Sequence, residues 1–189
     1  MGFYKQSRHT NSNCSAGQHW HKFPLPARRT AQLAVALLSL LVAVAPVRAT
    51  GVPAFTVVDL APGTDGSYAF DQSNAVEMGG WAYFSADNDD NGTELFRARG
   101  NGSGIDIELV KEIKAGAGGS YPDDLVAIGD YIYFSAYDNS NGFELWRTDG
   151  TEAGTTLIKD IWEGTDSSSP MGFVDQGDWI LFNAFDDVH

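Results

Sequence analysis

A unit of about fifty residues recurs along this chain and restricts what the chain can fold into. The stretch WAYFSADNDDNGTELFRARG (81–100) aligns with YIYFSAYDNSNGFELWRTDG (131–150), fifty positions later. The stretch WILFNAFDDVH (179–189) repeats the start of the same unit a further 48 positions on. A fixed period of this size is typical of solenoids and propellers, in which each unit packs only on its neighbours.

Each unit is expected to form four short antiparallel strands. In the second unit these are Leu125–Ile128, Tyr131–Tyr137, Phe143–Thr148 and Thr155–Ile161. Asn-Gly and Asp-Gly pairs stand between the strands, and both pairs join antiparallel strands tightly because they accept positive φ at low cost. No stretch after residue 50 keeps a helical period, so the sequence predicts an all-β chain.

The second strand of each unit is apolar on both faces. In the second unit Tyr131 and Tyr133 lie on one face, and Ile132 and Phe134 lie on the other. A sheet with one solvated face would instead alternate apolar with polar residues. A four-stranded sheet that is covered on both sides and repeated at this period is what a β-propeller blade requires. The predicted fold is therefore a partial β-propeller of tandem four-stranded antiparallel blades.

One motif in the second unit points to a known family. The run Glu144-Leu145-Trp146-Arg147-Thr148-Asp149-Gly150-Thr151, followed by Gly154-Thr155, resembles the bacterial ELWxxDGT repeat. The resemblance covers about residues 55–189 and implies a secreted or surface repeat protein with a propeller-like fold, with no activity attached to the repeat itself. In the first unit the Glu94–Arg97 run keeps the first half of the motif, but the Asp-Gly-Thr is lost.

The residues of this motif are expected to build shape rather than to contact a ligand. A large apolar side chain in the third strand suits the seam between two blades, while the polar residues can hydrogen-bond the backbone of their own turn. The expected structural residues are Glu144, Leu145, Trp146, Asp149, Gly150 and Thr151.

The first 49 residues have the pattern of a signal peptide. A basic region ends at Arg29, a thirteen-residue apolar run follows (33–45), and small residues precede a cleavage position after Ala49. Thirteen residues are short for a membrane-spanning helix, which needs about twenty, so an uncleaved anchor is the weaker alternative. The expected organisation is a signal peptide (1–49), a first repeat (50–113), a second repeat with the ELWRTDGT motif (114–161) and an incomplete third repeat (162–189).

The number of units is small for a closed propeller, which has about four to eight blades. The sequence therefore favours a fragment of a longer repeat protein. Completion by oligomerisation and a decayed coding sequence are the alternatives.

The charge of the chain excludes some classes of partner. After residue 49 there are six basic residues against 25 acidic ones, a net charge of −19. Such a surface repels phosphate backbones and anionic lipid, so neither nucleic acid nor membrane insertion after signal cleavage is expected. The single cysteine, Cys14, lies before the apolar run, so no disulfide is expected in the mature chain.

An acidic hairpin in the first unit is the candidate metal site. Asp87, Asp89 and Asn91 place oxygen ligands at alternate positions before Gly92, as in the first half of an EF-hand loop, and Glu94 adds a further carboxylate. These residues, Asp87, Asp89, Asn91 and Glu94, form the candidate calcium site. The alternative is a polar hairpin tip around an Asn-Gly turn, because the second unit keeps few of the charges.

The mature chain shows no catalytic constellation. It has no internal histidine or cysteine to activate a nucleophile, and no phosphate loop or dinucleotide fingerprint. The predicted function is a non-enzymatic secreted or cell-surface module for binding, adhesion or display. Its expected partner is an extracellular ligand or further repeats of the same protein, and calcium is the only candidate cofactor. The alternatives are a calcium-dependent extracellular module and a propeller-based extracellular hydrolase that uses a pair of carboxylates.

Overall fold

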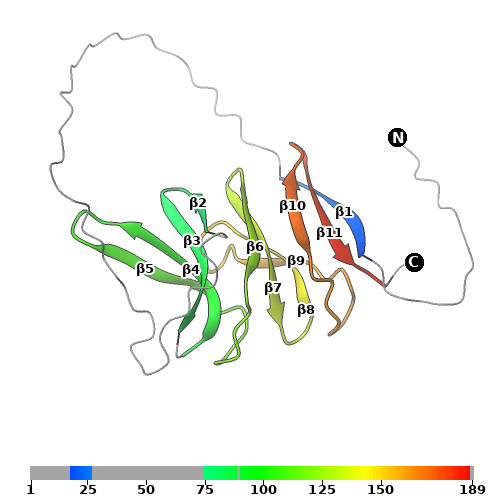
Figure 1. Cartoon of the computed structure of the whole chain (residues 1–189), viewed down its shortest axis with the longest axis horizontal. Coiled ribbons are helices and arrows are strands. Elements are labelled where there is room, and N and C mark those ends of the chain that lie inside the picture. The colour runs from blue at the N-terminus through cyan, green and yellow to red at the C-terminus, as the bar shows by residue number, and fades with distance from the viewer. Residues whose placement is uncertain (1–17, 27–74, 89, 188–189) are drawn as a thin grey trace, which may run out of the picture.

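The computed structural model describes residues 18–26, 75–88 and 90–187. Every regular element in these ranges is a β-strand, which confirms the prediction of an all-β chain. The strands form three antiparallel sheets that lie side by side (Figure 1). No helix among the described residues is long and apolar enough to cross a membrane.

The first two sheets each contain four strands in chain order. The first sheet consists of β2 (Val76–Met78), β3 (Trp81–Asn88), β4 (Gly92–Gly100) and β5 (Ile105–Lys111). The second sheet consists of β6 (Asp123–Ile128), β7 (Tyr131–Asp138), β8 (Gly142–Thr148) and β9 (Thr156–Lys159). The four strands expected in the second unit are therefore present, with ends shifted by up to two residues.

The central hairpins of these two sheets have the same register, fifty residues apart. Asn88 pairs with Gly92 at the tip of the first hairpin, and Asp138 pairs with Gly142 at the tip of the second. Both glycines have positive φ, 68° and 72°, as the Asn-Gly turns predict. A side chain at Gly142 would also overlap the backbone of Asp166, because the following link runs directly beneath the hairpin tip.

The third sheet combines two strands from the C-terminal unit with one strand from the N-terminal region. Strands β10 (Met171–Asp175) and β11 (Trp179–Phe185) correspond to β6 and β7, and β1 (Gln18–Pro24) pairs antiparallel with β11. Beside β11, β1 thus occupies the position that β8 occupies beside β7. Its residues lie within the segment expected to be a signal peptide. Most of that segment falls outside the described residues, and signal cleavage stays a prediction.

Apolar side chains cover the second sheet on both faces. Toward the first sheet, Ile132, Phe134 and Trp146 pack against Tyr83 and Leu95. This cluster puts Trp146 at the seam between two sheets, with only 7% of its surface exposed.

On its other face the second sheet repeats the same contact with the third sheet. Tyr133 and Leu145 pack against Ile180, Phe182 and Ala184. In both contacts, the sheet face that carries a tyrosine and a leucine packs against apolar side chains of the following sheet. What the described residues form is a stack of three sheets, without a closed ring.

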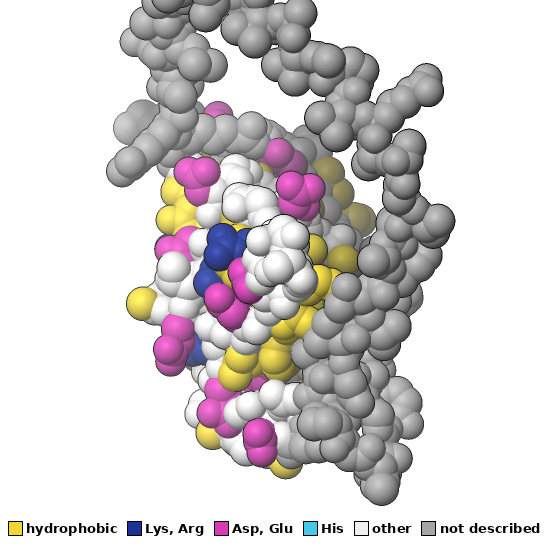
Figure 2. Space-filling model, turned by 90° about the vertical axis from the view of Figure 1, so that its left-hand side faces the viewer, with side chains coloured by type: hydrophobic (Ala, Val, Ile, Leu, Met, Phe, Trp, Pro, Cys, Tyr) yellow, Lys and Arg dark blue, Asp and Glu magenta, His cyan; other side chains and the backbone are white. Residues whose placement is uncertain are grey.

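The outer face of the first sheet reflects the acidic composition of the chain. Figure 2 shows acidic side chains at several separate places on this face, with fewer lysine and arginine side chains between them. The net charge of the whole chain is −13, so acidic residues outnumber basic ones.

Candidate binding pocket

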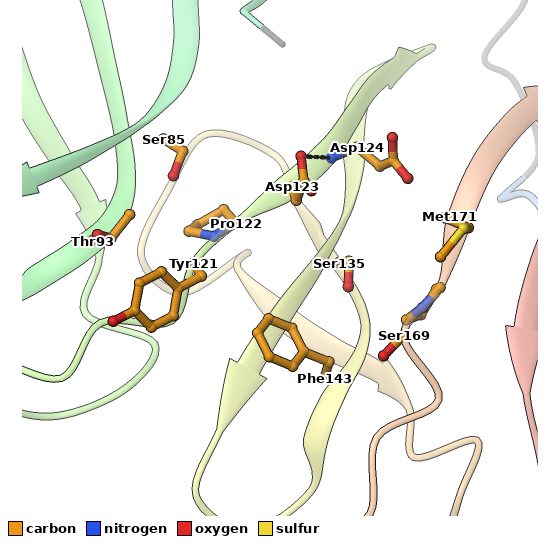
Figure 3. Close-up of a pocket in the computed structure, with 11 residues that line it drawn as sticks. Ser85, Thr93, Tyr121, Pro122, Asp123, Asp124, Ser135, Phe143, Ser169 and Met171 are labelled. Atoms are coloured by element: carbon orange, nitrogen blue, oxygen red, sulfur yellow. Dashed lines mark hydrogen bonds between the residues drawn. The ribbon is translucent and has the colours of Figure 1, made fainter. Parts of the chain in front are cut away.

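A pocket of about 490 Å³ opens where the links between the sheets meet the first residues of β6 and β10 (Figure 3). The first sheet contributes Ser85 and Thr93 to its lining, and the second sheet contributes Ser135 and Phe143. The two links add matching Xaa-Pro pairs, Tyr121-Pro122 and Ser169-Pro170. Asp123, Asp124 and Met171 complete the lining.

All three non-glycine residues with positive φ in the described part of the chain line this pocket. They are Tyr121 (49°), Asp124 (54°) and Ser169 (45°). Such a conformation costs a side-chain-bearing residue about 1–3 kcal/mol and persists only where the surrounding structure holds it. Tyr121 and Ser169 occupy equivalent places 48 residues apart, each directly before a proline. The pocket wall is thus a recurrent and locally strained feature of the unit.

A buried glutamate in each unit holds this strained link in place. Glu144 is fully buried, and its carboxylate accepts hydrogen bonds from Ile161 N (2.9 Å), Ser168 N (2.9 Å) and Ser168 Oγ (2.6 Å). Because both donor residues belong to the link toward the third sheet, Glu144 ties β8 to that link.

Glu94 makes two equivalent contacts and one different one in the first unit. Its carboxylate accepts hydrogen bonds from Ile113 N (3.2 Å), Lys114 N (3.0 Å) and Ser120 Oγ. Ser120 stands directly before Tyr121, so the glutamate fixes the residue that enters the pocket wall. The first glutamate of the ELW motif is therefore a structural latch in both units.

Burial sets the electrostatic state of these two latches. Desolvation raises the pKa of Glu144 above its ordinary value, although hydrogen bonds from Ser168 and Ile161 oppose the shift. Desolvation likewise raises the pKa of Glu94, against hydrogen bonds from Ser120, Lys114 and Ile113. In both cases desolvation is the largest influence on the pKa.

The lining of the pocket combines two carboxylates, four serine and threonine hydroxyl groups, and two aromatic rings, one of which carries the Tyr121 hydroxyl. The ring of Tyr121 is the most accessible of the aromatic groups, with 46% of the residue exposed. No lysine, arginine or histidine lines this pocket among the described residues. The arrangement can stack against an apolar ring face and accept hydrogen bonds from ligand hydroxyl or amino groups. It offers nothing that would attract an anion.

One contact across the pocket joins the second and third sheets. The carboxylate of Asp124 accepts a hydrogen bond from Gly172 N at 3.2 Å. Gly172 is the equivalent of Asp124 one unit later and also has positive φ, 67°. The same backbone conformation is thus formed by glycine in one unit and by aspartate in the other, where the side chain bridges to the neighbouring sheet.

The Asp-Gly-Thr turn after β8 builds its own shape, as the sequence predicts. Asp149 Oδ1 accepts hydrogen bonds from Thr151 N (2.9 Å) and Thr151 Oγ1 (2.7 Å), and the hydrogen bond from the Thr151 hydroxyl contributes most to lowering the pKa of Asp149. Gly150 (φ 91°) lies against the first sheet, where its carbonyl accepts a hydrogen bond from Arg97 Nη1 at 2.7 Å. The motif therefore also joins two sheets, a role that the sequence does not reveal.

Three of the four candidate calcium ligands, Asp87, Asn91 and Glu94, lie among the described residues. Asn88 Oδ1 accepts a hydrogen bond from Asn91 N at 2.7 Å, which gives the hairpin tip the form of a polar turn. The Asp87 carboxylate accepts a hydrogen bond from the Thr93 hydroxyl at 3.5 Å. The Glu94 carboxylate is buried and already accepts hydrogen bonds from the link between the first two sheets. Among the described residues, which omit Asp89, no three acidic, histidine or cysteine groups converge. Calcium binding stays a prediction that a calorimetric titration can test.

Sequence reasoning placed Glu144 among the structural residues but not its contact with the link, and it missed the latch role of Glu94 and the pocket. The latches had a signal, since a glutamate recurs at 94 and 144 while the acidic residues before it do not. The pocket had none, because its wall joins segments that are far apart in the chain.

Comparison of the chain with protein-family models, curated proteins and solved structures gave no match.

Proposed function

We propose that this chain is a non-enzymatic, secreted or cell-surface repeat module, a segment of a β-propeller, that binds a ligand in the pocket between its sheets. The observation that carries this proposal is the gathering of every described non-glycine residue of positive φ around one pocket. Strained residues cluster where a fixed geometry serves a ligand. The signal-peptide pattern of residues 1–49 and the ELWxxDGT resemblance support an extracellular setting.

The lining favours a neutral or cationic ligand rich in hydroxyl groups, such as a glycan. An exposed tyrosine ring offers a stacking surface, and Asp123 and Asp124 supply hydrogen-bond acceptors beside it. The serine and threonine hydroxyl groups of the wall can both donate and accept. Because no histidine stands beside these hydroxyl groups among the described residues, the wall favours binding over nucleophilic chemistry.

An array of immobilised oligosaccharides probed with the labelled full chain tests this proposal. The matched variant is Tyr121→Ser, because serine occupies the equivalent position at Ser169 and adopts the same backbone conformation. We expect a loss of binding of about 5- to 150-fold for this variant, taking as the scale the about 1–3 kcal/mol that a nucleobase gains by stacking on an aromatic ring. Ile105→Ser is the control, because Ile105 is 40% exposed and lies outside the pocket lining.

Two results would overturn the proposal. One is binding that Tyr121→Ser and the control variant leave equally intact, which would place the ligand elsewhere. The other is release of shorter sugars from a bound oligosaccharide, which would indicate an extracellular hydrolase.

A further inference from the structure

The contact between the first and second sheets depends on three side chains that receive the Asp-Gly-Thr turn. Arg97 donates a hydrogen bond to the carbonyl of Gly150, and a side chain at Gly150 would overlap the hydroxyl of Tyr83. Lys111 Nζ donates to the carbonyl groups of Thr155 (3.1 Å) and Glu152 (3.4 Å), just after the turn. We name Tyr83, Arg97 and Lys111 the first clasp.

The second sheet carries the same three side chains in the same register. Tyr83 pairs with Arg97 across β3 and β4, and Tyr133 pairs with Arg147 across β7 and β8. Lys111 lies opposite Leu95 in the first sheet, and Lys159 lies opposite Leu145 in the second. Tyr133, Arg147 and Lys159 therefore form a second clasp, which faces the third sheet.

The second clasp holds no turn among the described residues. The hydroxyl of Tyr133 is buried and lacks a hydrogen bond of good geometry, although the Arg147 side chain lies beside it; such a group is costly to remove from water. Arg147 stacks on the ring of Tyr131 at 4.7 Å, as Arg97 stacks on Trp81 at 4.3 Å. Unlike Arg97, it donates to no backbone carbonyl of the described chain.

Strand β1 fills the neighbouring strand position but brings no Asp-Gly-Thr turn to the second clasp. His21 pairs with Phe182 where Trp146 pairs with Phe134, so β1 matches the register of the third strand of a unit. By this register Leu25 takes the place of Gly150. Leu25 is partly buried and packs on the apolar cluster that contains Tyr133, with a side chain where the first clasp receives a glycine.

From this duplication we infer that the second clasp, together with the β11 edge, is a docking site for the strand and turn of another repeat unit. The partner is a polypeptide that presents a segment of Glu-Leu-Trp-Arg-Thr-Asp-Gly-Thr chemistry. Its strand replaces β1 on β11, and its glycine carbonyl accepts the hydrogen bond from Arg147. The inference rests on the proposed role as a repeat binding module, but it uses a surface distinct from the pocket.

A fluorescent peptide with the sequence of residues 142–161 tests this inference by fluorescence anisotropy on the full chain. A second full-length chain, His21→Pro, opens the β11 edge because proline in the middle of β1 removes backbone pairing. We expect the peptide to bind this variant at least tenfold more tightly than it binds the unmodified chain. Arg147→Ala should weaken binding about tenfold or more, the usual effect of losing a charged hydrogen-bond donor.

Matched variants distinguish the second clasp from the first. Arg97→Ala should leave peptide binding unchanged, and a peptide with valine in place of its glycine should fail to bind. Lys159→Ala, an exposed position, tests the second clasp without risk to the fold. Absence of binding to the His21→Pro chain would overturn the inference, and so would equal losses in Arg97→Ala and Arg147→Ala. Oligosaccharide binding by Arg147→Ala reports separately on the pocket.

Discussion

Replacing Glu144 by alanine tests most sharply how the links are held. The change removes the acceptor for two buried backbone N–H groups, those of Ile161 and Ser168. Each buried donor that is left without an acceptor lowers the free energy of unfolding by about 1–3 kcal/mol. The hydroxyl of Ser168 keeps a second acceptor, the carbonyl of Phe143 at 3.3 Å, so it adds little.

The burial cost of the carboxylate offsets part of this loss. Desolvation raises the pKa of Glu144. Alanine therefore removes the unfavourable burial of a carboxylate at the same time as it leaves the two N–H donors without an acceptor. We therefore expect a net loss near the low end of the two-donor sum, about 3 kcal/mol. That is a large fraction of the 5–15 kcal/mol by which a domain is typically stable.

Urea unfolding followed by tryptophan fluorescence at pH 7 measures this loss. The control is Glu163→Ala, an exposed glutamate on the same link. A double-mutant cycle with Ser168→Ala should give a coupling free energy of about 0.5–3 kcal/mol, as for residues of one hydrogen-bond network. A loss below about 0.5 kcal/mol for Glu144→Ala, the usual size of a surface effect, would refute the latch.

Three further predictions concern the stability of the stacked sheets. Gly150→Ala should lower the free energy of unfolding by about 1–3 kcal/mol more than Gly129→Ala. Both changes strain a positive φ, but only Gly150 faces another sheet. Equal urea midpoints for the two variants would contradict the clasp. Trp146→Ala should lower the free energy of unfolding by about 3–5 kcal/mol, and a small loss would mean that the side chain is exposed. Because the pKa values of Glu94 and Glu144 are raised in the folded chain, protonation of these residues favours the folded state. This contribution to stability is fully present below pH 4.5, the ordinary pKa, and is lost as the pH rises through the raised pKa values of the folded chain. The stability of Glu94→Gln should therefore fall less than that of the unmodified chain as the pH rises. Identical profiles of urea midpoint against pH would contradict the raised pKa of Glu94.

The sequence predicted local features well because short-range chemistry determines them. The Asn91-Gly92 and Asn141-Gly142 pairs identified the hairpin tips, and the two-faced apolar pattern of 131–136 identified a sheet covered on both sides. The seam position of Trp146 followed from the same pattern.

Features that depend on contacts between units were not predictable in the same way. Glu94 was grouped with the candidate calcium ligands because it adds a carboxylate to the acidic run that begins at Asp87. Its side chain is instead buried and faces a link about twenty residues away in the chain. Strand β1 could not be foreseen either, because its pairing with β11 joins opposite ends of the sequence.

The most direct test of the stacked arrangement is a nuclear Overhauser measurement between Tyr83 and Gly150. A side chain at Gly150 would overlap the Tyr83 hydroxyl, so the α-protons of this glycine lie beside the tyrosine ring. The stacking predicts cross-peaks between these α-protons and the ring protons of Tyr83. Their absence, with both residues assigned, would contradict the contact between the first two sheets and with it the clasp.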